Sequence, residues 1–212
     1  MNVIKHRKYK IYINEHPLMF IHTSCLDEVK TTFDSNIICL RWTNRPTTIF
    51  NCVDNLFKGS QPAIIIYGQD PLAIWKVFKA LYSHVVACGG IVRHADTNDL
   101  LMIFRRNNWD LPKGKRDKGE MKRDTAVREV QEETGVQDLT LTSKWGKTYH
   151  LFKTPKGKKI LKTTHWYHMT SADEELTPQV EEDIEIVAWV PLQEALQKTP
   201  IYSNIYEILV QL

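Results

Sequence analysis

Three glutamates, Glu129, Glu132 and Glu133, lie at positions i, i+3 and i+4 of one short stretch of the chain. In an α-helix this spacing puts all three carboxylates on one face. Like charges on one face destabilise a helix, but oxygen ligands grouped in this way suit a hard divalent cation such as Mg²⁺. Arg128 precedes Glu132 by four residues and can hold part of the group in place. The pattern therefore predicts a helix whose acidic face binds Mg²⁺.

The other residues of this stretch describe the helix that must carry the glutamates. At 100° per residue, Ala126, Val127 and Val130 fall on the face away from the carboxylates and predict packing on a core. Gly135 is expected to end the helix in the left-handed conformation. Residues 110–119, just before the helix, have the glycine-containing composition of a loop.

The segment from Gly114 to Val136 resembles the Nudix box, G-x5-E-x7-R-E-U-x-E-E-x-G-U, in which U is an aliphatic residue. All nine specified positions match, namely Gly114, Glu120, Arg128, Glu129, Val130, Glu132, Glu133, Gly135 and Val136. The resemblance implies a hydrolase of the diphosphate (pyrophosphate) bond in a nucleoside diphosphate linked to another group, an acid anhydride. It also implies Mg²⁺ as the cofactor, with Mn²⁺ as an alternative, and an α/β/α sandwich on a mixed sheet over residues 84–212.

The resemblance further implies which groups would hold the metal. Glu129 and Glu133 would be direct ligands, and Glu132 would be a further ligand or would support the other two. The backbone carbonyl of Lys113, just before Gly114, would complete the metal sphere. Water attacks phosphorus against the repulsion of a polyanion, and a metal held here would neutralise that charge.

Three more residues have expected catalytic roles by the same resemblance. Glu120 and Arg128 would brace the carboxylate cluster. The group that takes the proton from water is left open between Glu129 and an acid in the loop of residues 178–183, chiefly Glu182. The sequence alone does not choose between them.

Basic and aromatic side chains close to the box predict how the substrate binds. Lysine and arginine suit phosphate groups, and an aromatic ring can stack on a base. The predicted substrate-binding residues are Arg105, Trp109, Lys113, Gly114 and Lys115. The Leu-Pro-Lys-Gly form at residues 111–114 resembles the branch that cleaves diadenosine and diphosphoinositol polyphosphates. It therefore favours a dinucleoside polyphosphate, with ADP-ribose or a nucleotide sugar as the alternative substrate.

Composition and charge limit the classes of protein to which the chain can belong. The chain has 212 residues, of which 42% are hydrophobic and 25% are charged, as in ordinary soluble domains. The net charge of +3 does not indicate nucleic acid as a partner. No apolar run approaches 18 residues, which argues against a membrane span. The four cysteines lack a metal-binding spacing and are expected to be reduced, so the predicted location is cytoplasmic.

Two domains are predicted from the order of elements. Residues 1–83 read as a small α/β domain of the β-β-β-α-β-α kind, without a catalytic signature. Its strands are expected at residues 9–13, 18–22, 36–42 and 63–67, with a helix from residue 70 to about 84. Residues 84–212 are expected to form the hydrolase domain, with strands that include residues 100–105 and 184–190. Two rival functions are a nucleotide sensor that has lost turnover, and an RNA-end-binding protein that uses basic residues such as Lys5 and Arg7. A homodimer is left open.

Overall fold

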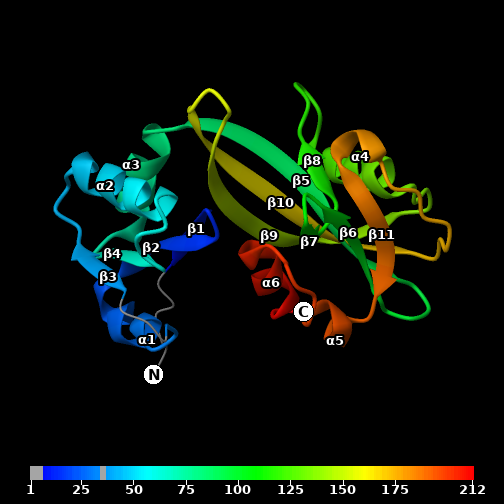
Figure 1. Ribbon diagram of the computed structural model, residues 1–212, viewed down its shortest axis with the longest axis horizontal. Helices are drawn as coiled ribbons and strands as arrows, with labels where there is room; N and C mark the ends of the chain where they lie inside the picture. Colours follow the sequence, from blue (N-terminus) through cyan, green and yellow to red (C-terminus); the bar gives the residue numbers. More distant parts are fainter. Residues whose placement is uncertain (1–6, 34–36) are drawn as a thin grey trace. The chain divides into compact units, whose positions relative to one another are not determined.

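The computed structural model describes residues 7–33 and 37–212 (Figure 1). The chain divides into two compact units, which we describe separately. Unit 1 contains residues 1–84 together with residues 149–162, and unit 2 contains residues 85–148 and 163–212. The segment of residues 149–162, assigned to the second domain from sequence, therefore clusters with the first part of the chain. The division at residue 83 remains our proposal for the domain boundary.

Unit 1 is built on a mixed sheet in which the strand order is β1-β2-β4-β3. β1 (Tyr9–Ile13) and β2 (His16–His22) form an antiparallel hairpin. Its two-residue turn, Asn14–Glu15, has φ of 47° and 65°, the left-handed values that match the twist of a hairpin. β4 (Ile64–Gly68) lies parallel to both β2 and β3 (Ile38–Arg41).

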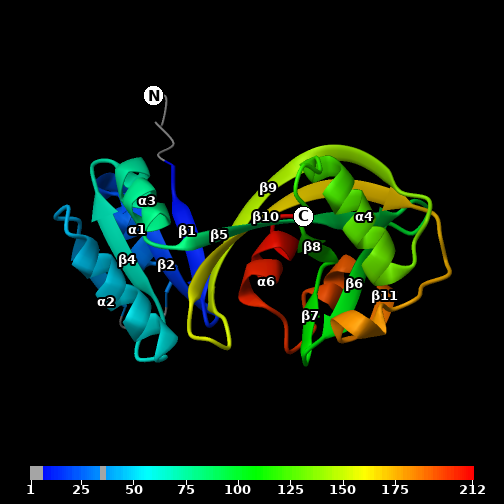
Figure 2. The same ribbon diagram turned by 90° about the horizontal axis from the view of Figure 1, so that it is seen from above.

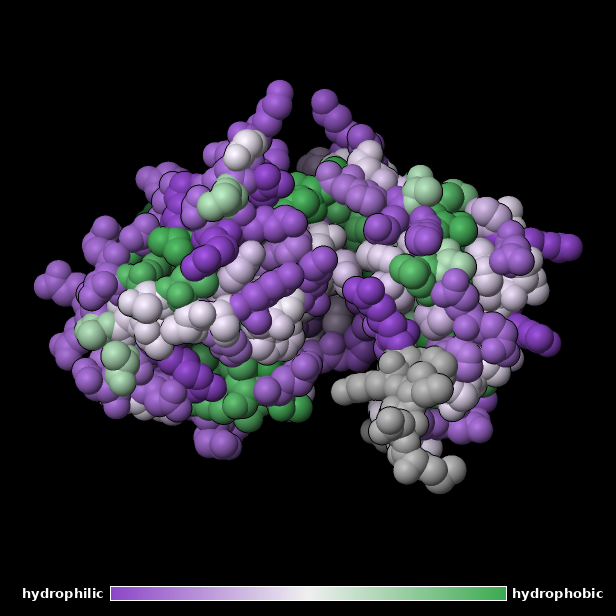
Figure 3. All heavy atoms as spheres, turned by 180° about the vertical axis from the view of Figure 1, so that it is seen from behind, coloured by the Kyte–Doolittle hydropathy of each residue, from purple (hydrophilic) through white to green (hydrophobic). Residues whose placement is uncertain are grey.

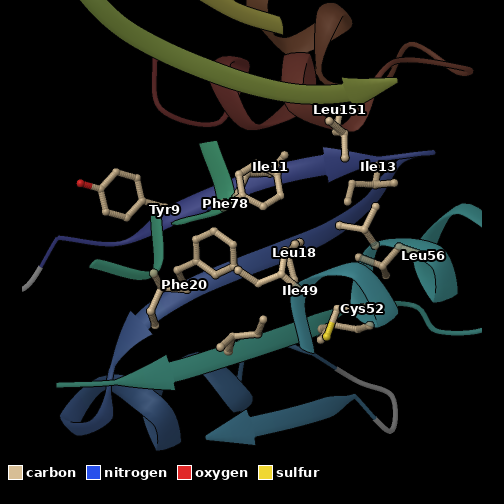
Figure 4. Close-up of a cluster of buried hydrophobic side chains, with 14 of the residues drawn as sticks. Tyr9, Ile11, Ile13, Leu18, Phe20, Ile49, Cys52, Leu56, Phe78 and Leu151 are labelled. Atoms are coloured by element: carbon tan, nitrogen blue, oxygen red, sulfur yellow. The ribbon is translucent and has the colours of Figure 1, made fainter. Parts of the chain in front are cut away.

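Helices cover both faces of this sheet. α2 (Pro46–Phe57) begins with proline, and Asp70 caps α3 (Pro71–Ala80) by accepting the Leu72 N–H at 2.9 Å. Both helices contribute to the main core cluster, part of which Figure 4 shows. α1 (Leu26–Lys30) follows a short 3-10 turn, η1 (Thr23–Cys25), and both contribute to a second cluster with Ile21 and Ile65. Burial on both faces explains why β4 is a continuous apolar run rather than an alternating one.

Unit 2 contains a larger set of strands in the order β11-β6-β5-β10-β9, although residues 149–153 of β9 and 159–162 of β10 belong to unit 1. These are β5 (Ser83–His94), β6 (Leu100–Arg105), β9 (Thr140–Lys153), β10 (Lys159–Ser171) and β11 (Ile184–Val190). Two short strands, β7 (Asn108–Asp110) and β8 (Lys113–Lys115), pair with β6 and β5 respectively. A 3-10 turn, η2 (Val180–Glu182), precedes β11.

Helices cover both faces of these strands (Figure 1 and Figure 2). α4 (Lys122–Thr134) packs through Ala126 and Val130 on one face. α5 (Leu192–Ala195) and α6 (Ser203–Leu209) contribute to a separate cluster with Trp166. The α/β/α sandwich on a mixed sheet that the sequence predicted is therefore confirmed.

Local differences from the sequence predictions have physical causes. The bounds of β1, β6 and β11 agree with the prediction, and Gly135 ends α4 with φ of 79°. The helix predicted to continue to His84 ends at Ala80, because the chain pairs into β5 from Ser83 onward. The prediction missed α1, β7 and β8, which are too short to show a clear period. Asn36, the first residue of the predicted third strand, and Lys5 lie outside the described residues.

The surface in view in Figure 3 is mostly hydrophilic, with hydrophobic residues in small separate patches. Within residues 7–33 and 37–212, no helix is long and apolar enough to cross a membrane.

Candidate active site

The close approach between β8 and α4 places Gly114 against the side chain of Glu129. A Cβ atom added to Gly114 would lie 1.6 Å from Glu129 Oε2 and 2.2 Å from its carboxyl carbon. Gly114 has no left-handed φ, so it is the missing side chain, and not the backbone conformation, that this position requires. The first glycine of the Nudix-like motif therefore provides the space that the Glu129 carboxylate occupies.

Arg128 connects three of the predicted acidic residues. Its Nε and Nη2 donate to the two oxygens of Glu120, at 2.8 and 3.0 Å. Its Nη1 donates to Glu132 at 2.7 Å and lies 2.9 Å from Glu129 Oε1. The bidentate contact, together with a hydrogen bond from the Thr125 hydroxyl, lowers the pKa of Glu120 to about 2. The bracing geometry expected of Arg128 and Glu120 is present.

Glu133 lies on the buried side of the helix and has partners from two other elements. Its Oε2 accepts the backbone N–H of Lys113 at 2.7 Å, and its Oε1 accepts from Arg105 Nη1 at 3.0 Å. Burial raises the pKa of Glu133 to about 7, although the charges of Lys113 and Arg105 act in the opposite direction. Burial also raises the pKa of Glu129, against the effect of Arg128. Both carboxylates therefore lie where an additional cation would stabilise their charged forms.

The side chain of Lys113, which is predicted to bind substrate, is buried and paired within the protein. Lys113 is 6% exposed, and its ammonium group donates to the carboxylate of Asp110, which is 2% exposed. Burial lowers the pKa of Lys113, while Asp110 acts against that shift. The ammonium is an internal partner of Asp110, so a contact with a substrate phosphate would require this ion pair to open, and the substrate-binding role of Lys113 stays a prediction.

Asp110 is a member of the site that the sequence analysis missed. Its carboxylate lies 3.5 Å from Arg105 Nε in addition to its contact with Lys113. It also accepts the N–H of Leu111 at 2.8 Å. Asp110 and Lys113 are three residues apart, a spacing that predicts a side-chain contact only within a helix. Because this segment shows no helical periodicity, the sequence did not predict their contact.

The remaining predicted residues lie in different surroundings, and the structure does not bring all of them to the acidic helix. Glu182 is exposed in η2, and its Oε2 lies 3.9 Å from Arg105 Nη1. Lys115 is exposed, and its backbone carbonyl accepts from Arg128 at 3.3 Å. Trp109 is half-buried between Phe104, at 5.3 Å between ring centroids, and Lys198 Nζ, at 4.7 Å from the ring centroid. The ring of Trp109 is thus partly occupied by contacts within the protein.

The donor set fits a hard divalent cation in chemical type. Glu129, Glu132 and Glu133 are oxygen donors on one helix, two of them with raised pKa values. Over the described part of the chain, however, no three acidic, histidine or cysteine side chains converge closely enough to form a finished metal site. Arg128 and Arg105 occupy oxygens of Glu132 and Glu133 in this arrangement.

Comparison with known proteins identifies the family. The family model described as the NUDIX domain matches residues 83–212, well over half of the chain. The chain therefore belongs to the NUDIX domain family. The match includes α4 and β8, the two elements that hold the site.

Two curated relatives are similar over part of their length. The chain is 37% identical over 123 residues to the protein called MutT4 of Mycobacterium tuberculosis (strain CDC 1551 / Oshkosh), covering 52% of this chain and 48% of that protein. It is 32% identical over 114 residues to the 8-oxo-(d)GTP phosphatase of Mycolicibacterium smegmatis (strain ATCC 700084 / mc(2)155), covering 52% of this chain and 32% of that protein. The chain thus spans less than half the length of each relative.

Solved structures are similar over about 60% of this chain at lower identity. A MutT protein from Methanosarcina mazei Go1 is 20% identical with a TM-score of 0.48, over 61% of this chain and 95% of that one. An Ap4A hydrolase of C. elegans is 20% identical with a TM-score of 0.44, over 60% of this chain and 93% of that one.

Proposed function

We propose that this chain is a nucleotide pyrophosphohydrolase that depends on Mg²⁺ or Mn²⁺. The reaction adds water across a P–O–P linkage and yields two phosphate-bearing products. The observation that carries the proposal is the placement of the Glu129 carboxylate in the space left by Gly114, with Arg128 connecting it to Glu120 and Glu132. A solvated acidic helix would not need this close packing against a neighbouring strand.

The proposed roles follow from the surroundings of each group. Glu129 and Glu133 would hold the metal, with Glu132 and the carbonyl of Lys113 as further donors. A bound Mg²⁺ would neutralise phosphate charge and increase the acidity of a coordinated water. Arg128 keeps the Glu129 side chain in position, and the backbone N–H of Lys113 orients Glu133.

The proton acceptor is proposed to be Glu129 or Glu182. Burial raises the pKa of Glu129, which favours proton uptake, and the Arg128 contact keeps it oriented. Glu182 is more exposed and belongs to a different segment, near Arg105. Glu129→Gln and Glu182→Gln distinguish the two candidates. The variant that removes the proton acceptor should reduce kcat more than it weakens metal binding.

For the substrate we propose a nucleoside triphosphate or a nucleoside diphosphate linked to another group. The name of the relative that acts on 8-oxo-(d)GTP supports an oxidised purine triphosphate. A dinucleoside polyphosphate stays a candidate through the Leu-Pro-Lys-Gly segment, although the Lys113 side chain on which that preference rests is paired with Asp110 in this structure. ADP-ribose and nucleotide sugars are the remaining candidates, and exposed basic residues such as Lys115 would meet the phosphates.

A substrate panel with a matched pair of variants tests the proposal. The panel contains 8-oxo-dGTP, dGTP, diadenosine tetraphosphate and ADP-ribose with Mg²⁺, and the products are separated by chromatography. Glu133→Gln should lower kcat/KM by at least about a hundredfold, because it removes a buried charged group from the site. Glu185→Gln makes the same change on an exposed residue of β11 and should leave activity within about twofold. Absence of hydrolysis across the panel would favour the sensor alternative.

Metal binding is measured independently of turnover. The electron paramagnetic resonance signal of free Mn²⁺ falls as the ion binds, so titration gives its Kd directly. Glu129→Gln and Glu133→Gln should each weaken Mn²⁺ binding, whereas Glu185→Gln should not. Equal Mn²⁺ affinity in all four proteins would contradict the metal assignment even if the variants lost activity.

A further inference from the structure

A polar pocket of about 270 Å³ lies in unit 1, far along the chain from the Nudix-like motif. We call it the strand-end pocket. Its lining residues used below are Arg41, Trp42, Asn44, Gly68, Gln69 and Asp70. The hydrolase proposal above uses none of these residues.

The pocket forms where three parallel strands end together. In register, His22 of β2 faces Gly68 of β4, and Arg41 of β3 faces Tyr67 of β4. The Trp42 N–H donates to the Tyr67 carbonyl at 2.8 Å, so the chain just after β3 stays against β4. In open sheets with parallel strands, ligands bind outside the carboxyl ends of the strands, where connecting loops diverge.

One of the residues that line the pocket has a hydrogen-bond donor that the protein does not satisfy. The indole Nε1 of Trp42 is buried and has no partner. A Cβ added to Gly68 would lie 3.3 Å from Trp42 Cβ and 4.0 Å from Cδ1, the carbon bonded to Nε1, so the indole packs on the end of β4. A buried N–H without an acceptor is energetically unfavourable, and a ligand that supplied an acceptor here would remove this cost.

Further donors lie beside this indole. Within the described ranges the guanidinium of Arg41 forms no ion pair or hydrogen bond, although the ammonium groups of Lys8 and Lys159 in the same unit both have acidic partners. Gln69 Oε1 lies 3.2 Å from His22 Nε2, which leaves the amide nitrogen of Gln69 as a donor. Asn44 adds a second amide group. Donors therefore outnumber acceptors, as a site for an oxyanion requires.

The charge of the pocket limits the oxyanion to a single charge. Arg41 supplies one positive charge, and the carboxylate of Asp70 supplies one negative charge. Asp70 Oδ1 caps α3 through Leu72 N–H, so this carboxylate stays at the pocket and would repel a phosphate dianion. A carboxylate is a monoanion and matches the planar fork of a guanidinium.

We propose that the strand-end pocket binds a small molecule that carries a carboxylate group. Arg41 holds the carboxylate, the Trp42 indole N–H donates to it, and the amides of Asn44 and Gln69 complete the donors. The volume accommodates a molecule of roughly ten to fifteen non-hydrogen atoms, smaller than a nucleotide. The site would give unit 1 a ligand of its own.

Nuclear magnetic resonance of the full chain tests this directly, with benzoate and acetate as probes. The chain has six tryptophans, and the spectrum of Trp42→Phe identifies the indole resonance that belongs to Trp42. Benzoate should move this resonance downfield in a saturable manner, because the N–H gains an acceptor. Benzoate should also bind more tightly than acetate, because its ring contacts the indole.

Variants decide whether the shift reports the proposed contact. Arg41→Gln should raise the Kd for benzoate about ten- to a hundredfold, as expected when a charge-assisted pair is removed. Arg45→Gln removes the same charge four residues away, outside the pocket lining, and should change the Kd by less than twofold. If Arg41→Gln fails to fold, Arg41→Lys serves instead and should weaken benzoate binding about tenfold, because lysine lacks the fork.

Three results would overturn the inference. One is a Trp42 indole resonance that does not move up to about 50 mM of either carboxylate, well beyond a millimolar Kd. Another is equal weakening by Arg41→Gln and Arg45→Gln, which would indicate general charge attraction. The third is a lower Kd for inorganic phosphate than for benzoate at pH 7.5, which would contradict a carboxylate as the ligand. Each is independent of nucleotide hydrolysis.

Discussion

Replacing Gly114 with alanine should displace the Glu129 carboxylate while leaving the fold intact. The added Cβ would lie 1.6 Å from Glu129 Oε2, so this oxygen must move by roughly 2 Å to reach an ordinary contact distance. The backbone at Gly114 has no left-handed φ and accepts alanine without strain. The carboxylate is the end of a flexible side chain, so it moves in preference to β8 or α4.

The size of the effect on catalysis follows from that displacement. A misplacement of about 1 Å at a reacting group costs about a hundredfold in rate, and we expect at least this loss in kcat/KM for Gly114→Ala. Stability should change by less than about 1 kcal/mol, because the substitution breaks only a partly exposed ion pair between Arg128 and Glu129. The variant therefore tests the position of the Glu129 carboxylate while the carboxylate itself is retained.

The assay compares kcat/KM and thermal unfolding of the wild type, Gly114→Ala and Gly146→Ala. Gly146 lies in β9 with no left-handed φ and with open space around its would-be Cβ, so it controls for a glycine-to-alanine change in a strand. We expect Gly146→Ala to keep activity within about twofold. If Gly114→Ala remains as active as the wild type while Glu129→Gln is inactive, the space at Gly114 does not position the carboxylate and our interpretation of the motif is wrong.

Three other changes test separate parts of the structure. Arg128→Lys should lower kcat/KM at least about tenfold in steady-state assays, because lysine cannot reproduce the bidentate contact with Glu120; unchanged turnover would reduce Arg128 to a charge-balancing role. Lys113→Met should lower the free energy of unfolding by about 2–4 kcal/mol in urea, because it leaves the Asp110 carboxylate with Arg105 alone; a loss confined to polyphosphate substrates would instead support the phosphate contact. Burial lowers the pKa of His165 to about 4 from an ordinary 6.5. As the pH drops from 6.5 toward 4, the unfolded chain therefore binds a proton at His165 that the folded chain does not. The free energy of unfolding should fall over this range by at most about 3 kcal/mol. His165→Gln should remove this part of the pH dependence of the melting temperature, and an identical profile in both proteins would exclude His165 as its source.

Local rules in the sequence were sufficient for the elements that carry the site. The 3.6-residue period of Ala126 and Val130 predicts α4 and its buried face, and Gly135 predicts its end. The spacing of Arg128 and Glu132 predicts a contact across one helical turn. Such features depend on residues a few positions apart, so the sequence contains all the information they need.

Contacts between distant segments were decided by the tertiary structure. The hairpin residues 149–162 cluster with unit 1, where β1 and β9 pair through Tyr12 and His150, and nothing local to either strand predicts that partner. Asp110 belongs to the site only because β7 brings its carboxylate to the Lys113 ammonium and to Arg105.

The same distinction applies to charge. Sequence showed that Lys113 is basic and next to the motif, which suggested a phosphate contact. The structure buries its ammonium beside Asp110, where desolvation makes an internal partner more favourable than an exposed position. Residue type and spacing determined the chemistry that this chain can perform, whereas burial and long-range pairing determined which charged groups remain available to perform it.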